Sequence, residues 1–329
     1  MATGRRDQGA FVSGAVRAQL GDGRWHFQHG PIDCILSAEG EAGAAAECLE
    51  HAWARFRGVL DELVAELPLL RTDLSSLPGG QVAPQGPIAR RMVEACRPHA
   101  AAGRFITAMA AVAGSVAEEL IGSFADPRIR RAFVNNGGDI ALHLAPGASF
   151  DVGLFADPAS GLAGLPLDGR FSIDAGTPIR GIATSGWRGR SFSLGIADAV
   201  TVLATTASAA DAAATVIGNA VDVEDGRIVR RPANEVRDDS DLVHRLVTRE
   251  VPTLPPTLVE RALANGLARA RREIESGRVI AALICLQGRA RSCVAAAGLE
   301  GREKQARRSI SPRAHAIASS ARRSSSTAV

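Results

Sequence analysis

The spacing of apolar residues along the chain predicts helices and strands in an irregular order. Apolar and polar residues alternate over residues 24–37 on either side of Gly30-Pro31, which predicts two strands joined by a turn. Elsewhere large apolar residues recur at intervals of three or four, as they do on one face of a helix. Such helices are predicted over 42–67, from Pro87 onward, over 103–124, over 209–221 and over 258–276.

Short apolar runs broken by Gly and Pro lie between these helices and are typical of strands. The predicted strands cover residues 132–134, 140–144, 149–155, 171–173, 199–204 and 279–286. The segment 135–139, between the first two, contains Asn-Gly-Gly, which indicates a β-hairpin turn. Because the helices and strands do not alternate regularly, we expect an α+β fold rather than a doubly wound α/β fold.

Composition divides the chain into three segments. We expect a flexible N-terminal segment over 1–20, a globular domain over 21–298 and a disordered basic tail over 299–329. Residues 301–329 carry seven basic side chains against the single acidic Glu303, and no aromatic side chain that could stack on a base. The chain has no apolar stretch long enough for a membrane span and no secretory signal. We therefore expect a cytoplasmic protein that binds neither membrane nor nucleic acid.

Two features of the composition argue against whole classes of site. The chain has no Tyr, and all but one of its 38 basic side chains are Arg, the exception being Lys304 in the expected tail. A catalytic Tyr is therefore excluded, and a Schiff-base or phosphate-loop Lys is disfavoured. The five Cys include no C-x-x-C and the seven His no H-E-x-x-H, which argues against a structural zinc site.

A carboxylate and a hydroxyl stand one helical turn apart in the sequence Ala-Asp-Ala-Ala-Ala-Thr. Asp211 and Thr215 would lie on the same face of the predicted helix, where their oxygen atoms could bind Mg²⁺ together with substrate phosphates. The alternative is that both side chains form hydrogen bonds only within their own helix. Ser208 would be the N-cap of the helix, with Asp211 completing a capping box, and Thr215 would bond to the carbonyl four residues earlier.

A second candidate segment combines hydroxyl and guanidinium groups at an expected strand end. Thr184, Ser185 and Gly186 are followed by Arg188 and Arg190, a set of side chains suited to a phosphate or another anion. Ser185 is also a candidate nucleophile, although neither His nor Asp lies near it in the sequence. The alternative is a solvated turn.

Two further candidates lie at predicted strand ends. In Asn136, Gly137, Gly138 and Asp139 the two glycines would let backbone amides approach a ligand closely, unless the segment is a plain hairpin turn. Asp198 leads into a buried strand, where it is either a ligand of the site or a solvated residue at the end of the strand.

Taken together, four segments in this order resemble the superfamily of the magnesium-dependent FAD:protein FMN transferase, which has the ApbE-like fold. The segments are 110–119, 136–139, 184–186 and 200–215. Gly30-Pro31-Ile32-Asp33 and residues 196–203 are similar to an uncharacterised branch of it, the UPF family numbered 0280. The resemblance covers residues 24–295 and implies mixed, mostly antiparallel sheets packed with helices in a single compact domain.

The resemblance also implies a role for each candidate residue. Asp211 and Thr215 would hold Mg²⁺ with a backbone carbonyl near residues 111–114, while the segments 136–139 and 184–186 would line the site of FAD or a related flavin nucleotide. The acceptor would be a Thr of a flavoprotein. Residues 191–198 stand where transferases carry His-Ile-Ile-Asp-Pro, and they contain neither His nor Pro.

Three functions follow from these observations. The first is a metal-dependent enzyme that transfers FMN or otherwise acts on a flavin nucleotide. The second is a non-catalytic accessory protein that binds a flavin or another small molecule. The third is a different reaction in the same pocket, on a small organic acid.

Overall fold

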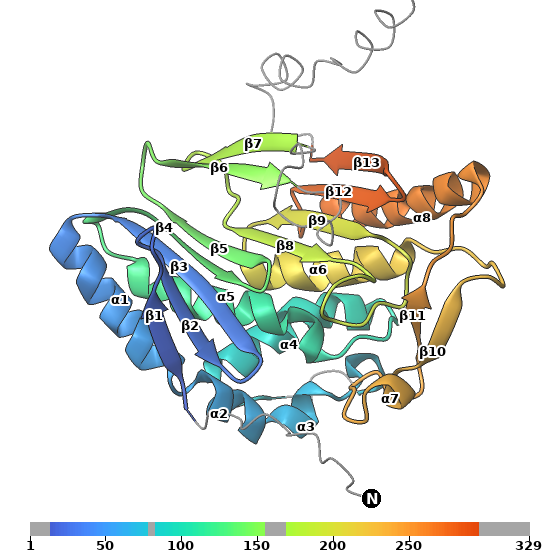
Figure 1. The fold of residues 1–329 in the computed structure, drawn as a ribbon, viewed down its shortest axis with the longest axis horizontal. Coiled ribbons are helices and arrows are strands. Elements are labelled where there is room, and N and C mark those ends of the chain that lie inside the picture. The colour runs from blue at the N-terminus through green and yellow to red at the C-terminus, as the bar shows by residue number, and fades with distance from the viewer. Residues whose placement is uncertain (1–13, 78–82, 155–168, 296–329) are drawn as a thin grey trace, which may run out of the picture. The chain divides into compact units, whose positions relative to one another are not determined.

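A nine-stranded sheet runs through the computed structural model, which describes residues 14–77, 83–154 and 169–295 (Figure 1). The strand order is β1-β2-β3-β4-β5-β8-β9-β12-β13, and all neighbouring strands are antiparallel. The strands are β1 (Val16–Gln19), β2 (Trp25–His29), β3 (Ile32–Gly40), β4 (Ile129–Asn136), β5 (Asp139–Leu144), β8 (Gly181–Ser185), β9 (Ala199–Ala204), β12 (Ala281–Leu286) and β13 (Arg289–Val294). Two-stranded sheets are formed by β6 (Ser149–Leu154) with β7 (Gly169–Asp174) and by β10 (Val229–Pro232) with β11 (Leu246–Glu250).

Helices cover one face of the large sheet (Figure 1). The α-helices are α1 (Ala42–Phe56), α2 (Val59–Ala65), α3 (Leu67–Leu70), α4 (Pro87–Ala101), α5 (Val112–Ile121), α6 (Ala207–Ala220), α7 (Ala233–Val236) and α8 (Pro256–Glu275). The 3-10 turns are η1 (Leu74–Ser76), η2 (Ala108–Ala111) and η3 (Gly122–Phe124). The β6–β7 hairpin packs against part of the opposite face, where Leu142, Ile173 and Ile182 are buried together. The structure thus confirms the expected α+β fold.

Two hydrophobic clusters lie between the sheet and its helices. The first combines β2–β5 with α1, α4 and α5, and the second combines β8, β9 and β12 with α6 and α8. A smaller cluster, which includes Cys96, Ala111 and Ala212, joins α4, η2 and α6. Helices α5 and α6 therefore lie side by side at the junction of the two larger clusters, which is where the candidate site is built.

The predicted helices are present, but two of them differ in extent. The helix predicted over 42–67 is interrupted at Arg57 and Gly58, where glycine lowers helix propensity, and continues as α2. The helix predicted over 103–124 has only about three regular turns, because residues 104–107 have no regular secondary structure and the ends are 3-10 turns. The strands β1, β8, β10, β11 and β13 were not predicted, since they are short and contain few large apolar residues.

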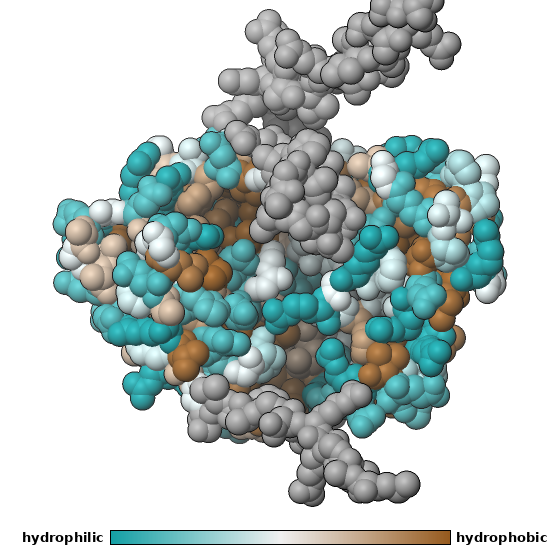
Figure 2. All heavy atoms as spheres, viewed as in Figure 1, coloured by the Kyte–Doolittle hydropathy of each residue, from teal (hydrophilic) through white to brown (hydrophobic). Residues whose placement is uncertain are grey.

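Several expectations concern the ends of the chain. Residues 16–19 of the expected N-terminal segment form β1, while 1–13 and the expected tail over 299–329 lie outside the described residues. Within the described residues, no helix is both long enough and apolar enough to cross a lipid bilayer. The face drawn in Figure 2 intersperses hydrophobic and hydrophilic side chains over the strands and helices.

Candidate functional site

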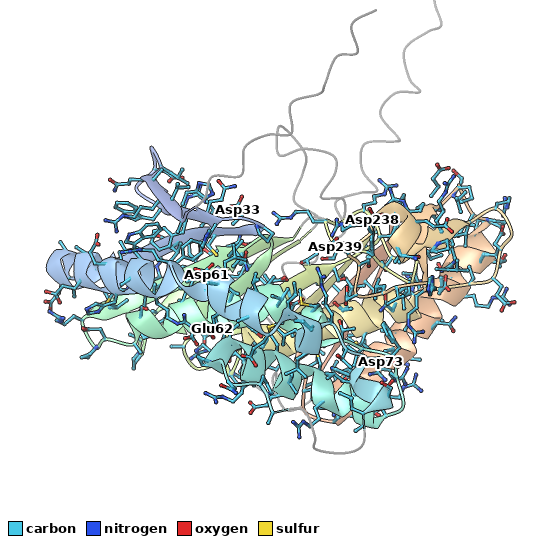
Figure 3. The ribbon with its side chains drawn as sticks, turned by 90° about the horizontal axis from the view of Figure 1, so that it is seen from below. Asp33, Asp61, Glu62, Asp73, Asp238 and Asp239 are labelled. Atoms are coloured by element: carbon cyan, nitrogen blue, oxygen red, sulfur yellow. The ribbon has the colours of Figure 1, made fainter. Side chains whose placement is uncertain are left out.

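Four segments that are distant in sequence meet at one end of the large sheet. Antiparallel pairing brings the start of β3, the β4–β5 turn, the end of β8 and the start of β9 to the same end of the sheet, where these strands begin or terminate. Asp33, labelled in Figure 3, lies at the start of β3 directly after the Gly30-Pro31 turn. Helices α5 and α6 pack against the strands at this end of the sheet, so that the candidate segments of the sequence surround one region of the molecule.

Asp211 projects from α6 toward the first turn of α5. Its Oδ2 atom accepts a hydrogen bond of 2.9 Å from the amide of Gly114. The N-cap of α6 is Thr206, whose Oγ1 accepts from the amide of Ala209, so the expected capping box with Ser208 as N-cap is wrong. Ser208 instead donates its hydroxyl to Glu118 of α5. The carboxylate of Asp211 is therefore directed at a neighbouring helix and not at its own.

The helix pair requires glycine at position 114. A Cβ atom there would lie 2.3 Å from the carbonyl oxygen of Ala207 and 2.9 Å from Cβ of Asp211. This close approach carries the amide of Gly114 to the carboxylate. It also places Asp211 at the N-terminus of α5, where the helix dipole favours negative charge. The lack of a side chain at Gly114 thus lets the backbones of α5 and α6 come into contact.

Asp139 is the second carboxylate of the site. It is 9% exposed at the first position of β5, and its Oδ1 accepts from the amide of Thr184 at 3.1 Å. Burial raises the pKa of Asp139 to about 7, against the lowering effect of this hydrogen bond. Burial, and then the charge of Asp139, raise the pKa of Asp211 well above its usual range. A cation bound between Asp139 and Asp211 would offset both the burial of their charges and the repulsion between them.

The turn between β4 and β5 consists of two glycines. Gly137 and Gly138 have φ values of 65° and 114°, which only glycine adopts without strain at such a turn. The amide of Gly138 donates to Oδ1 of Asn135. Asn136, on the last position of β4, is 6% exposed and donates from Nδ2 to the carbonyl oxygen of Ala113. The predicted hairpin turn is confirmed, and it also delivers Asn136 and Asp139 to the site.

The end of β8 places its three candidate residues differently. Thr184 is exposed, and its Oγ1 lies 3.0 Å from Oγ1 of Thr201 on β9. Ser185 is half-buried and lies next to α6, close to Gly218. Gly186 is buried against the carbonyl of Asp198. No His, Asp or Glu forms a hydrogen bond with Ser185 among the described residues, so the structure does not provide the base that a serine nucleophile requires.

The two arginines after β8 make different contacts. Arg188 lies over Trp187 and forms an ion pair of 3.3 Å with Asp198. Arg190 donates from Nη2 to the carbonyl of Pro31, and its guanidinium lies close to Gly137. Arg190 thus connects two of the turns around the site while remaining exposed.

Asp198 is held by protein donors on both carboxylate oxygens. Oδ1 accepts from Nε1 of Trp187 at 3.2 Å, and Oδ2 accepts from the amide of Gln287. These contacts join the loop after β8 to the turn after β12. With both oxygens bonded and a side chain that is 11% exposed, Asp198 is not the solvated strand-end residue offered as the alternative.

The oxygen atoms around Asp211 fit Mg²⁺. Thr215 lies one turn further along the same face of α6 and has no hydrogen-bond partner for its side chain among the described residues. Within that part of the chain no group of three or more His, Cys, Asp or Glu could hold a metal ion. A site here would combine the carboxylates of Asp211 and Asp139 with the Thr215 hydroxyl, oxygen donors that Mg²⁺ accepts. The carbonyl of Ala113, in the range 111–114 expected to supply a backbone donor, accepts from Asn136 and points away from Asp211.

Three neighbours of the site were missed at the level of sequence. Thr206 caps α6, Glu118 bonds to Ser208, and the thiol of Cys96 is buried near Asp211. Burial, and then the charge of Asp211, raise the pKa of this thiol. No local signal marks these residues, because each contact joins segments that are distant in sequence.

Known proteins resemble this chain in sequence. A sequence model of the family described as AbpE bacteria matches residues 17–292. A UPF0280 protein of Methanopyrus kandleri is 35% identical over 196 residues, which are 58% of this chain and 73% of that protein. The UPF0280 protein of Methanothermobacter thermautotrophicus is 33% identical over 217 residues, 64% of this chain and 78% of the relative.

Solved structures were compared as well. The apo form of the flavinyl transferase ApbE of Pseudomonas stutzeri aligns with 86% of this chain and 95% of its own, at 14% sequence identity and a TM-score of 0.43. The family model matches most of the chain, and the regions aligned with the two UPF0280 proteins are 73% and 78% of the lengths of those proteins. The chain therefore belongs to the ApbE-like family described as AbpE bacteria, together with the UPF0280 proteins.

Proposed function

We propose that this protein is an Mg²⁺-dependent enzyme that acts on a flavin nucleotide, transferring FMN from FAD to a Thr of an acceptor flavoprotein. Membership in the ApbE-like family supports the reaction class. The observation that carries the proposal is the meeting of two carboxylates from different elements near the N-terminus of α5, the buried Asp139 and the half-buried Asp211.

The residues of the site divide between the metal and the nucleotide. Asp211 and Thr215 would hold Mg²⁺, which when bound supplies a Lewis acid for a phosphoryl oxygen. The backbone of Gly137 and Gly138 would face the nucleotide, as would Ser185. Arg190 is exposed beside the glycine turn and suits a phosphate oxygen.

The proposed transfer balances without an oxidant or reductant. The hydroxyl oxygen of the acceptor Thr forms a bond to the phosphorus of the FMN half of FAD. The bond from that phosphorus to the bridging oxygen breaks, and AMP leaves with the electron pair. The hydroxyl proton passes to water. The products are AMP and an FMN phosphoester of the acceptor.

The test is an incubation of the full chain with FAD, Mg²⁺ and a Thr-containing acceptor protein, followed by measurement of AMP and of flavin fluorescence that survives denaturation. We expect both products, and a loss of at least about 100-fold in rate for Asp211→Asn, which removes a charged oxygen from the metal. The proposal fails if the chain forms neither product while an established ApbE transferase forms both under the same conditions.

One observation favours a second candidate, a protein that binds a flavin or another small molecule without turnover. Residues 191–198 contain no His or Pro, and Asp198 of this segment is occupied by Trp187 and Gln287. A binder of this kind would be stabilised against heat by FAD or FMN but would release no AMP. If neither nucleotide stabilises the protein, a different reaction on a small organic acid becomes the leading function.

A further inference from the structure

Three polar side chains form a stripe along α6. Asp211, Thr215 and Asn219 follow one another at intervals of four residues, so they occupy neighbouring positions on one face of the helix. Each is half-buried, whereas the other residues of α6 are buried except Ala209 and Ala220 near its ends. Asn219 thus continues the stripe one turn beyond the two residues assigned to the metal, and lies about 12 Å from Asp211 along the helix axis.

The side-chain amide of Asn219 is oriented by its own contacts. Its Oδ1 atom accepts from the amide of Leu194 at 2.9 Å and from the hydroxyl of Ser193 at 3.4 Å. A backbone N–H group can only donate, so the oxygen and not the nitrogen of the side chain must face Leu194. Nδ2 has no hydrogen-bond partner among the described residues, and its two N–H donors are therefore unspent within that part of the chain.

The two ends of the stripe differ in the charge that they favour. Asp211 and Thr215 supply oxygen atoms for Mg²⁺, which attracts phosphate. Asn219 is the penultimate residue of α6, where the carbonyl groups of the last helical turn carry a partial negative charge. An anion is disfavoured at that end, so the free donor of Asn219 suits a neutral acceptor oxygen. The stripe therefore fits a ligand with a charged group at Asp211 and a neutral acceptor at Asn219.

A flavin nucleotide carries these two groups at its two ends. A five-carbon ribityl chain separates its phosphate from the ring, and the dioxopyrimidine part of the ring has neutral carbonyl oxygens, which accept hydrogen bonds and cannot donate them. AMP, the other half of FAD, has no carbonyl oxygen. The chemistry of the stripe therefore matches the FMN half of FAD.

We infer that Asn219 binds the flavin ring, donating from Nδ2 to a carbonyl oxygen of the dioxopyrimidine. The inference rests on the proposed function for the identity of the ligand. It adds a residue that contacts the ring to those that hold the metal, and it orients the flavin along α6, with the phosphate toward Asp211 and the ring toward Ala220.

Replacement by aspartate separates the structural use of this side chain from its use as a donor. In Asn219→Asp one carboxylate oxygen still accepts from Leu194 and Ser193, so the contact of α6 with that segment is retained. The other oxygen takes the place of the donor and faces the carbonyl oxygen of the ring as a second acceptor. A structural role alone predicts unchanged affinity for flavin in this variant, whereas a ligand role predicts a loss.

The experiment titrates FMN and AMP, each with saturating Mg²⁺, into the full chain and follows binding by calorimetry. We expect the dissociation constant of FMN to rise by at least about tenfold in Asn219→Asp and in Asn219→Ala, as for the loss of a hydrogen bond to a desolvated partner. That of AMP should change by less than about twofold. Asn219→Ala carries the test if the aspartate variant does not fold.

Two controls address the charge that aspartate adds. Repulsion of phosphate by the new carboxylate would weaken FMN and AMP alike, so AMP reports it directly. Asn265→Asp on α8 adds the same charge at an exposed residue whose side chain bonds to the carbonyl of Asp222, and it should change both constants by less than about twofold.

The infrared spectrum of bound FMN provides a second measurement, which a structural role would not affect. A hydrogen bond from Asn219 should lower the frequency of a ring carbonyl band in the wild type, and Asn219→Asp should return it toward that of free FMN. A folded Asn219→Asp protein that binds FMN as tightly as the wild type, or that loses FMN and AMP equally, overturns the inference and leaves the proposed function standing. If the wild-type chain binds no flavin and releases no AMP from FAD, both are overturned.

Discussion

The carboxylates of Asp139 and Asp211 make the stability of the metal-free protein depend on pH. Burial raises the pKa of Asp139 to about 7, and burial with the charge of Asp139 raises that of Asp211 as well. A carboxyl group whose pKa is higher in the folded than in the unfolded state takes up protons on folding. Its stabilising contribution is complete below the unfolded pKa near 3.8 and is lost as the pH rises through the folded value.

We therefore expect the free energy of unfolding in EDTA to fall by about 1 kcal/mol between pH 6 and pH 8. Urea denaturation at pH 6, 7 and 8 measures this, and Asp139→Asn should reduce the slope because it removes one of the two titrating groups. The exposed Asp151→Asn serves as control and should leave the slope unchanged. An unaltered slope in Asp139→Asn would show that this carboxyl does not titrate in that range.

Local spacing predicted one part of the site and could not predict the other. Asp211 and Thr215 lie on one face of α6 because four residues make about one helical turn. The meeting of Asp139 with Asp211 depends on the register of β5 with β8 and on the packing of α6 beneath them. Neither is encoded in the residues next to Asp139.

Among the elements, the contact between α5 and α6 depends most on a single residue. Gly114→Ala would place a methyl group 2.3 Å from the backbone oxygen of Ala207, so the helices must separate. We expect a loss of about 2–3 kcal/mol of stability, typical of overpacking, and weaker Mg²⁺ binding because the Gly114 amide moves away from Asp211. Thermal and urea denaturation measure the first effect and calorimetry the second.

Gly122, at the C-terminal end of the same helix, is the matched control. A Cβ atom there meets nothing within 4 Å, and its φ of −56° suits any residue. Gly122→Ala should be neutral or stabilising by up to about 1 kcal/mol, since alanine restricts the unfolded chain. Equal losses in the two variants would mean that the α5–α6 contact is not the cause.

The elements that were predicted well are those with strong local patterns. The strand predicted over 199–204 has the observed bounds of β9, and the two glycines predicted the β4–β5 turn. The N-cap of α6 was misplaced by two residues, because Thr206 and Ser208 are both good caps and only the contact of Ser208 with Glu118 separates them. The exposed strands β1 and β13 have no apolar face that could have revealed them.

On the scale of the whole molecule, helices α4 and α8 are connected by buried charges, although they are distant in sequence. His99 of α4 is 1% exposed, and its Nδ1 lies 3.2 Å from Nη2 of Arg269 on α8. Glu273, with no exposed surface, pairs with Arg269 and accepts from Nε of Arg278 at 2.7 Å. Burial by itself raises the pKa of Glu273, but the bonds from His99 and Arg278 and the charge of Arg269 together lower it to about 2.

A lowered pKa means that Glu273 stabilises the fold above its unfolded value near 4.5 and loses this contribution as the pH falls through about 2. Replacement by Gln leaves Arg269 buried without its counter-charge, for which a loss of about 3–5 kcal/mol is typical. We expect Glu273→Gln to lower the free energy of unfolding, measured by urea denaturation at pH 7, by this amount, and to differ less from the wild type at pH 3. The exposed Glu275→Gln, on the same helix, should match the wild type in stability at both pH values.

Helix α8 packs on α6, which carries Asp211. A folded Glu273→Gln protein with unchanged Mg²⁺ affinity would therefore show that this charge cluster stabilises the fold without adjusting the site.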